Sequence, residues 1–241
     1  MSTHSNTETK PAAIYSDGEY LRNNKDWHTE DSPYKASFVR AAIKRNSIAF
    51  TKCADVGCGA GLVTELLAKT FPEKTFVGYD LSSDAQEFWK QRSKYPNLSY
   101  SNANLLEADI SYDLIICLDV VEHIEDYFGF LRSLRTKGKT FIFNIPLDMS
   151  VLKIITPGIR YAREEFGHLH YFNRYTAIKT LQDCGYTIRD AKLAVPYVST
   201  MPRKIRQWLA LPFRVLSLSL GKNFASKVFG GISLVITAAV E

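Results

Sequence analysis

Short apolar runs alternate with stretches of helical spacing through the middle of the chain. Five runs are expected to form strands, at 53–56, 75–79, 98–101, 114–118 and 140–144. Apolar positions three and four residues apart predict helices after the first of these runs, over 82 to about 94, and from 118 to about 134. Strands that are apolar throughout and separated by helices are typical of a parallel sheet covered on both faces. Because crossovers are right-handed, we expect a doubly wound α/β sheet.

The flanks add further elements and define the expected organisation of the chain. Ser32-Pro33 has the chemistry of a helix start, and the helix is expected to run to about Arg45. A helix over 174–183, closed by Gly185, and strands at 186–193 and 232–240 bring the expected strands to seven. We expect a disordered tail (1–14), an N-terminal cap segment (15–47) and one catalytic domain (48–241) with a helical insertion at about 200–228.

Composition narrows the class of protein without identifying it. The 241 residues are 46% hydrophobic and 23% charged, which is typical of a globular chain with a sizeable core. No uncharged apolar run is long enough to span a membrane, and the polar N-terminus does not resemble a secretion signal. None of the four cysteines forms a CxxC pair. These features predict a cytoplasmic protein with free thiols.

The glycine-rich turn between the first strand and the next helix carries the most information. It reads Asp55-Val-Gly57-Cys58-Gly59-Ala-Gly61. Glycines here permit positive φ and let a ligand approach the backbone. The spacing differs from the G-x-G-x-x-G of dinucleotide sites. Asp55 at the strand end disfavours a diphosphate and suits a ligand that carries positive charge.

Asp80 follows the second strand, at the place where an acid commonly accepts the hydrogen bonds of both ribose hydroxyls. Together with D-x-G-x-G-x-G and the block Asp113-Leu-Ile-Ile-Cys-Leu-Asp119-Val-Val-Glu122-His123, it resembles the class I S-adenosylmethionine-dependent methyltransferases. The resemblance covers about residues 50–145. It implies a Rossmann-like, seven-stranded sheet whose last strand is antiparallel, with S-adenosylmethionine as cofactor.

The resemblance also implies where the cofactor lies. The methionyl group would lie near the turn that contains Asp55, Gly57, Cys58, Gly59 and Gly61, and the ribose on Asp80. The adenine would lie near Leu81 and the Asn104-Leu105 turn, and the sulfonium-bearing chain near Leu118 and Asp119. Many relatives carry Asp where this chain has Asn104.

Three histidines are candidates for the base that a hydroxyl acceptor would need. His168 and His170 lie two residues apart in an expected extended segment and should project to one face. The third is His123. The run Asp119-Val-Val-Glu122-His123 resembles the E-x-x-E-H of polyprenyl-quinone O-methyltransferases, where acids and histidine can hold a divalent metal. Residues 119, 122 and 123 would meet on one face of a helix start, yet we do not favour a metal, because acids also stabilise a helix N-terminus.

We assign four further residues to the acceptor pocket: Trp27, His28, Asn144 and Tyr171. Trp27 and His28 belong to a segment that resembles the caps preceding the core in small-molecule methyltransferases. Such a cap would exclude water and shape the pocket. The alternative is a solvated surface helix with one packed tryptophan.

The net charge of +5 is confined to the C-terminal stretch, where residues 200–241 carry six bases against one acid. This distribution disfavours a nucleic-acid partner, whose binding surface usually surrounds the site. The motif that marks base methyltransferases is also missing after the fourth strand. Residues 203–216 combine cations with Trp, Phe and Leu, so they would either cap the substrate pocket, which we favour, or contact a membrane surface.

These features predict transfer of a methyl group to a small molecule, most simply to a hydroxyl with histidine taking the proton. N- or C-methylation, a nicotinamide-dependent oxidoreductase and a catalytically silent binding protein are the alternatives. The sequence leaves the acceptor and the oligomeric state open.

Overall fold

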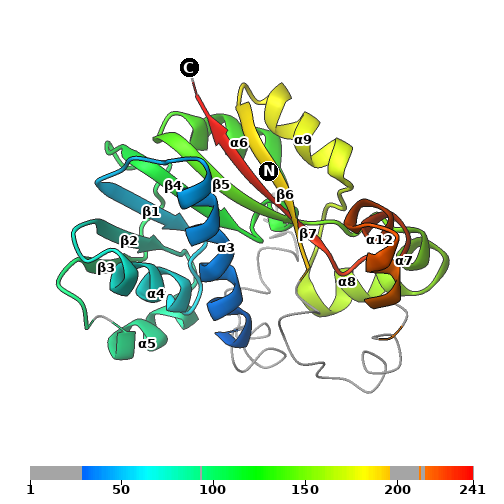
Figure 1. Cartoon of the computed structure of the whole chain (residues 1–241). Helices are drawn as coiled ribbons and strands as arrows, with labels where there is room; N and C mark the ends of the chain where they lie inside the picture. Colours follow the sequence, from blue (N-terminus) through cyan, green and yellow to red (C-terminus); the bar gives the residue numbers. More distant parts are fainter. Residues whose placement is uncertain (1–28, 93, 196–211, 213–214, 241) are drawn as a thin grey trace, which may run out of the picture.

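The computed structural model describes residues 29–92, 94–195, 212 and 215–240, and it contains one seven-stranded sheet. The strands are β1 (Lys52–Val56), β2 (Thr75–Tyr79), β3 (Leu98–Ser101), β4 (Tyr112–Leu118), β5 (Gly138–Pro146), β6 (Thr187–Ala194) and β7 (Ser233–Ala239). Their order is β3-β2-β1-β4-β5-β7-β6, and β7 runs antiparallel to both neighbours (Figure 1). The doubly wound fold and its antiparallel last strand are therefore confirmed.

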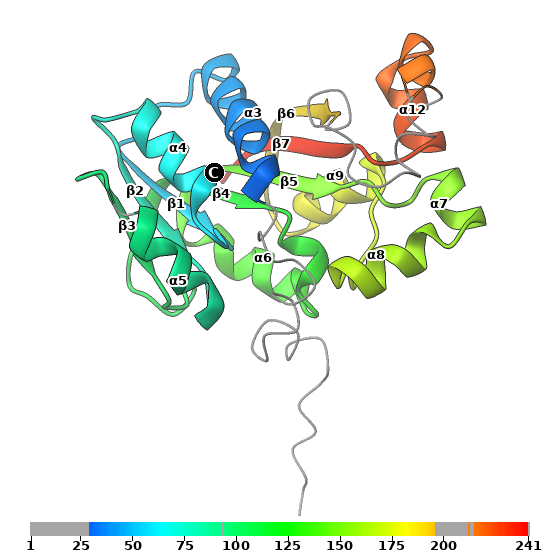
Figure 2. The same ribbon diagram turned by 90° about the horizontal axis from the view of Figure 1, so that it is seen from below.

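Helices cover both faces of the sheet because its strands are apolar on both faces (Figure 2). One face packs against α3 (Ser32–Arg45) and α4 (Leu62–Thr70). The other packs against α6 (Tyr127–Arg135) and α9 (Arg174–Asp183). The short helix η1 (Thr29–Asp31) precedes α3, and α5 (Ser83–Arg92) lies at the β3 edge.

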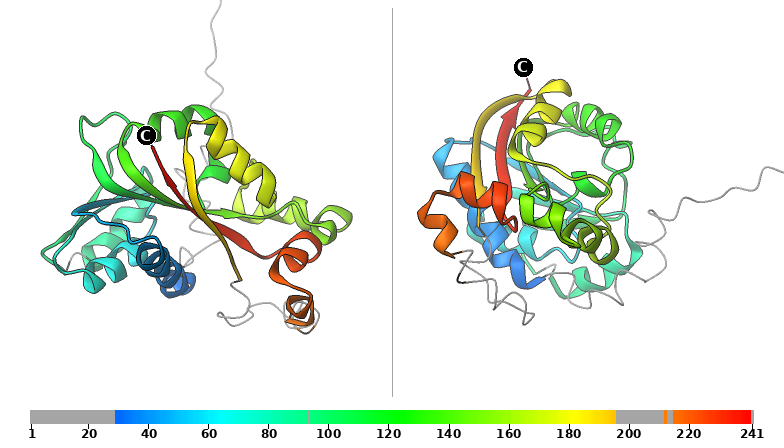
Figure 3. Two further views of the ribbon diagram at one scale, coloured as in Figure 1. Left: turned by 45° about the horizontal axis from the view of Figure 1, so that its top comes forward. Right: turned by 90° about the vertical axis from the view of Figure 1, so that its right-hand side faces the viewer.

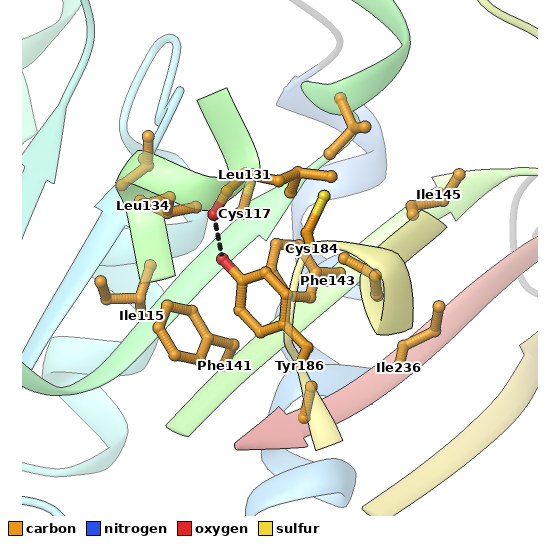
Figure 4. Packing of buried hydrophobic residues seen from close by; sticks show 14 of the residues in the cluster. Ile115, Cys117, Leu131, Leu134, Phe141, Phe143, Ile145, Cys184, Tyr186 and Ile236 are labelled. Atoms are coloured by element: carbon orange, nitrogen blue, oxygen red, sulfur yellow. Dashed lines mark hydrogen bonds between the residues drawn. The ribbon is translucent and has the colours of Figure 1, made fainter. Parts of the chain in front are cut away.

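Aromatic side chains fill the core between the sheet and the helices α6 and α9. The Tyr186 ring meets Phe141 and Phe143 edge-on, with centroids 4.9 and 5.3 Å apart. Its buried hydroxyl donates a hydrogen bond of 2.8 Å to the Leu131 carbonyl of α6 (Figure 4). A buried tyrosine needs such a partner, so this contact fixes the helix over the sheet.

Local signals set several helix boundaries as predicted. Helix α3 begins at Ser32–Pro33, and α9 spans Arg174–Asp183 with a capping box between Asn173 and Thr176. Gly185 follows α9 with a φ of 87°, a conformation that glycine adopts without strain.

The single helix expected from 118 to 134 is wrong, since the chain forms two pieces there. A short 3-10 turn, η2 (Val121–His123), ends where Ile124 becomes extended. Helix α6 begins afresh because the Asp126 side chain accepts the amide of Gly129, at 2.9 Å. Residue 119 therefore precedes any helix, and it does not share a helical face with 122 and 123.

Three helices were not assigned individually from the sequence. Helices α7 (Val151–Ile155) and α8 (Gly158–Phe166) follow β5, and α12 (Lys222–Val228) precedes β7 (Figure 3). Helix α12 lies within the expected insertion. The expected tail, Trp27, His28 and most of 203–216 lie outside the described residues. Among the helices of the described part, none combines the length and apolarity needed to cross a membrane.

Candidate functional site

The glycine turn joins β1 to α4 and lies at the carboxyl ends of the parallel strands. Gly57, Gly59 and Gly61 have φ values of 72°, 52° and 78°, which other residues adopt only with strain. The amides of Gly57 and Cys58 both donate to the Tyr79 carbonyl at the end of β2. These two hydrogen bonds hold the turn against the end of β2, so its backbone faces the end of the sheet.

Two aromatic residues that the sequence analysis missed hold this turn from outside. The Trp89 indole donates to the Gly59 carbonyl at 2.9 Å, and the Tyr100 hydroxyl donates to the Gly61 carbonyl at 2.8 Å. The two rings stack on each other with centroids 5.3 Å apart. A Cβ on Gly61 would lie only 2.5 Å from the Tyr100 ring. This packing explains why the third position of the turn needs glycine.

Asp80 lies directly after β2 and is organised by backbone amides. Its Oδ2 accepts from the Gly59 amide at 2.8 Å, and its Oδ1 accepts from the Ser82 amide at 2.9 Å. Each oxygen keeps a further lone pair, so the carboxylate can still accept two hydroxyl groups. Burial raises the pKa of Asp80 above its ordinary value, against the effect of these amides.

Asp55 is the penultimate residue of β1 and is almost completely buried, with 3% of its surface exposed. The Thr64 hydroxyl on α4 donates to its Oδ2 at 2.7 Å. Burial raises the pKa of Asp55 to about 7, although the Thr64 hydrogen bond and the charge of Lys35 oppose the shift. A buried, half-ionised carboxyl at this place is suited to receive a cationic ligand group.

Both acids line one cavity of about 800 Å³, a volume suited to a small organic ligand. All of the residues that the resemblance assigned to the cofactor line it: Asp55, Gly57, Cys58, Gly59, Gly61, Asp80, Leu81, Asn104, Leu105, Leu118 and Asp119. Leu81 is exposed and Leu105 is buried. Asn104 organises its own turn, because its Oδ1 accepts the Leu106 amide at 3.1 Å and its Nδ2 donates to Glu107.

Asp119 adopts a φ of 56°, which is uncommon outside glycine. Its carboxylate lies 2.5 Å from Lys35 Nζ on α3 and accepts a hydrogen bond from Asn144 Nδ2 at the end of β5. The Asn144 Oδ1 atom is buried and has no partner within the described residues. Lys35 is a cavity residue that the sequence analysis missed, because only the fold brings α3 beside β4.

Glu122, His123 and His168 form a second group in the same cavity. The carboxyl of Glu122 is fully buried, and neither oxygen has a hydrogen-bond partner in the described chain. Burial and the charge of Asp119 raise the pKa of Glu122 well above its ordinary value. Burial and the neighbouring His168 ring, 4.9 Å away between centroids, lower the pKa of His123 to about 4.

One ligand atom from each of Glu122, His123 and His168 lies within 4.8 Å of the others, so this set fits a divalent cation. It differs from the expected set, in which Asp119 was the third ligand. Asp119 is instead bound to Lys35 and Asn144. A cation would require Glu122 to ionise.

His168 is held by a carboxylate that the sequence analysis did not single out. Its Nδ1 lies 2.5 Å from Asp148 Oδ2, and both residues are buried and line the cavity. Lys153 on α7 forms an ion pair with the other oxygen of Asp148. Burial opposes ionisation of Asp148, but the His168 hydrogen bond and the Lys153 charge outweigh it and lower the pKa of Asp148 to about 2.

His170 does not share the face of His168, contrary to the expected alternation. The amides of Leu169 and His170 both donate to the Glu122 carbonyl, so the segment bends instead of continuing as a strand. The His170 ring packs on Tyr127, and its Nε2 lies 3.2 Å from the Glu125 carbonyl oxygen. Neither His170 nor Tyr171 is among the residues that line the cavity. The Tyr171 hydroxyl instead donates a hydrogen bond to the His168 carbonyl.

Comparison with known proteins agrees with this geometry. A family model described as "Methyltransferase domain" matches residues 27–191. The chain is 32% identical over 108 residues to a ubiquinone biosynthesis O-methyltransferase of Rickettsia conorii. This alignment covers 44% of this chain and 36% of that protein. It is 31% identical over 122 residues to the protein of the same name from Rickettsia bellii, covering 47% and 51%. The alignments thus span about a third to a half of these relatives.

Solved structures share the fold over nearly the whole chain. A magnesium protoporphyrin IX methyltransferase from Synechocystis PCC 6803 with bound S-adenosylhomocysteine has a TM-score of 0.61 at 16% identity, covering 96% of this chain and 98% of that one. The N-methyltransferase NodS from Bradyrhizobium japonicum, also with S-adenosylhomocysteine, has a TM-score of 0.57 at 16% identity, covering 98% and 99%. These structures show the shared fold. The family model and the acid-flanked glycine turn indicate S-adenosylmethionine as the cofactor. The chain belongs to the class I S-adenosylmethionine-dependent methyltransferases.

Proposed function

We propose that this protein transfers the methyl group of S-adenosylmethionine to a hydroxyl of a small-molecule acceptor, and that His168 takes the hydroxyl proton. When bound, the cofactor would supply an electrophilic methyl group, whose bond to the positive sulfur breaks as the methyl carbon bonds to the acceptor oxygen and S-adenosylhomocysteine leaves as a neutral thioether. The observation that carries the proposal is the Asp148–His168 pair within the same cavity as Asp55 and Asp80. The ubiquinone O-methyltransferase names of the relatives support transfer to oxygen.

The residues at the strand ends have complementary roles in holding the cofactor. Asp80 would accept the ribose hydroxyls through the lone pairs that its backbone amides leave unused. Ionised Asp55 would attract the methionyl ammonium. Lys35, now 2.5 Å from Asp119, would meet the methionyl carboxylate, because it lines the cavity and its charge acts on Asp55.

The tautomer of His168 follows from its partner. An ionised Asp148 can only accept, so Nδ1 of His168 carries the proton and Nε2 keeps its lone pair. Of the two ring nitrogens of His168, only Nδ1 has a hydrogen-bond partner within the described residues. Asp148 would orient the ring and stabilise its positive charge once Nε2 has taken the proton, as the aspartate of a serine-protease triad does. His123 is the weaker candidate base because of its lowered pKa.

A methyl-transfer assay with His168→Ala tests this role, and His170→Ala is the matched control outside the cavity. With tritiated cofactor and a panel of phenols and amines, we expect His168→Ala to lower kcat for a phenol by about 10²–10⁴-fold. Cofactor affinity should stay unchanged, and His170→Ala should remain within a few-fold of wild type. Equal activity of the two variants on phenols, or methylation of amines alone, would contradict the proposal.

Asp148→Asn tests the orienting role separately. Asparagine offers a donor where Nδ1 now needs an acceptor, which favours the wrong tautomer of His168. We expect kcat to fall by about 10²-fold or more with little change in KM. Because the two residues act as a unit, the double variant with His168→Ala should be no slower than His168→Ala alone. Independent, additive losses would show that Asp148 has another role.

A further inference from the structure

Apolar side chains that face solvent are concentrated at one corner of the molecule. Eight of the eleven large hydrophobic residues that the described chain exposes lie in the segments 149–155 and 215–224. We name these eight the apolar corner: Met149, Val151, Ile154, Ile155, Val215, Leu216, Leu220 and Phe224. Ile155 is 71% exposed and Leu216 is 68% exposed. Concentration of this kind marks an interaction surface, whereas scattered exposed residues do not.

The two segments meet, although about sixty residues separate them in the sequence. Helices α7 and α12 are in contact, and both lie at the end of the sheet beyond β7 (Figures 1 and 2). The turn after α12 is close to α7, because a Cβ on Gly230 would lie 2.6 Å from the Ser150 hydroxyl. The apolar corner is therefore one feature of the fold, built from two distant parts of the chain.

The two segments that form the apolar corner carry a net positive charge. Lys222 and Lys227 on α12 are exposed, and Lys153 lies on α7. Across the described residues of 147–157 and 215–240, Asp148 is the one acid, and it is buried against His168 and Lys153. Helix α8, which contacts α7, carries two exposed arginines and two exposed glutamates and so adds no net charge. Apolar side chains flanked by lysines match an anionic lipid surface.

The apolar corner also adjoins the acceptor end of the cavity. Lys153 of α7 and the residues 231–233 after α12 line the cavity on the side of His168. The cofactor residues Asp80 and Leu81 belong to a different wall, built from the ends of β2 and β3. A surface docked through α7 and α12 would thus lie next to the catalytic histidine and leave the adenosyl end free.

We propose that the apolar corner docks this protein onto anionic lipid bilayers. The exposed side chains enter the interface between head groups and acyl chains, while Lys222 and Lys227 contact lipid phosphates. The docking stands independently of the methyl-transfer chemistry. Its consequence for the proposed function, if both hold, is that an acceptor with a long apolar tail reaches His168 from the bilayer.

Co-sedimentation with vesicles tests the docking. The probes are extruded vesicles of phosphatidylcholine alone and of phosphatidylcholine mixed with phosphatidylglycerol. The corner variant is Ile154→Ser/Ile155→Ser/Leu216→Ser. The matched control is Ile110→Ser/Tyr175→Ser, which removes exposed apolar side chains elsewhere; Ile110 is 40% and Tyr175 is 70% exposed.

We expect wild type to sediment with phosphatidylglycerol vesicles at low salt and to be released at high salt. The corner variant should bind at least tenfold more weakly, whereas the control should bind as wild type does. Failure of wild type to sediment at low salt, or equal binding by the corner variant, would overturn the proposal. These outcomes say nothing against methyl transfer, which is assayed in solution with soluble acceptors.

Two further readouts separate the bilayer from other occupants. If the corner variant unfolds several degrees below the control, the apolar corner is covered by the chain itself, and the proposal is wrong. If wild type elutes as a dimer in size-exclusion chromatography and the corner variant as a monomer, the surface joins two copies instead. Unchanged unfolding temperature and elution, combined with lost vesicle binding, support docking on lipid.

Discussion

The pKa of Asp55 makes cofactor binding depend on pH in a calculable way. Burial raises this pKa to about 7, so the carboxyl is partly protonated near neutral pH before the ligand binds. A methionyl ammonium interacts favourably with the ionised form alone. With a pKa of about 7, roughly three quarters of Asp55 is ionised at pH 7.5 and about one eleventh at pH 6.0. Affinity should therefore fall about eightfold, or ~1.2 kcal/mol, over this interval.

Calorimetric titration of S-adenosylhomocysteine at the two pH values measures the change. Asp55→Asn is the control, because an amide oxygen can still accept the Thr64 hydroxyl but cannot ionise. The variant should bind more weakly at pH 7.5 and lose most of the pH dependence. Any contribution from Asp80, whose pKa is also raised, persists in the variant and so cancels in the comparison. Equal pH dependence in both proteins, or tighter wild-type binding at pH 6.0, would show that Asp55 does not bind the ammonium group.

Two further substitutions test the packing around the site. Gly61→Ala forces alanine into the left-handed conformation and displaces the Tyr100 ring. We therefore expect the free energy of unfolding to fall by about 2–3 kcal/mol, which lowers Tm by about 4–12 °C. Cofactor binding should also weaken. Gly221→Ala, with φ of 101° and open space around the added Cβ, should leave binding intact; equal losses of affinity would contradict the steric argument. Tyr186→Phe removes the hydrogen bond to Leu131 and should lower stability by about 1 kcal/mol, measured by denaturant unfolding, without changing cofactor affinity. A loss of affinity there would mean that the helical layer controls the site.

Features encoded in short segments could be predicted from the sequence. Every expected strand forms, since runs such as 114–118 are apolar throughout and need a sheet buried on both faces. The glycine turn and Asp80 also lie where expected, because strand ends in a parallel sheet converge on one edge. The bounds of helix α9 were predicted to the residue, with Gly185 as the closing signal.

Features that depend on distant contacts could not be predicted. Lys35 and Asp119 meet only because α3 packs beside the sheet, and their separation of 84 positions gives no local signal. His168 obtains Asp148 from a loop twenty residues away. The alternation expected for 168 and 170 failed because the Glu122 carbonyl accepts two successive amides and bends the segment. In each case a tertiary hydrogen bond or ion pair outweighed the local pattern.

Calorimetric titration of S-adenosylhomocysteine into wild type and into Asp80→Asn tests the cofactor site most directly. We expect one equivalent bound by wild type, no measurable binding of NADH, and at least about tenfold weaker binding by the variant, because a donor replaces one acceptor facing the ribose. Absence of binding by wild type, or equal affinity of the two proteins, would contradict the placement of the cofactor on the glycine turn and Asp80.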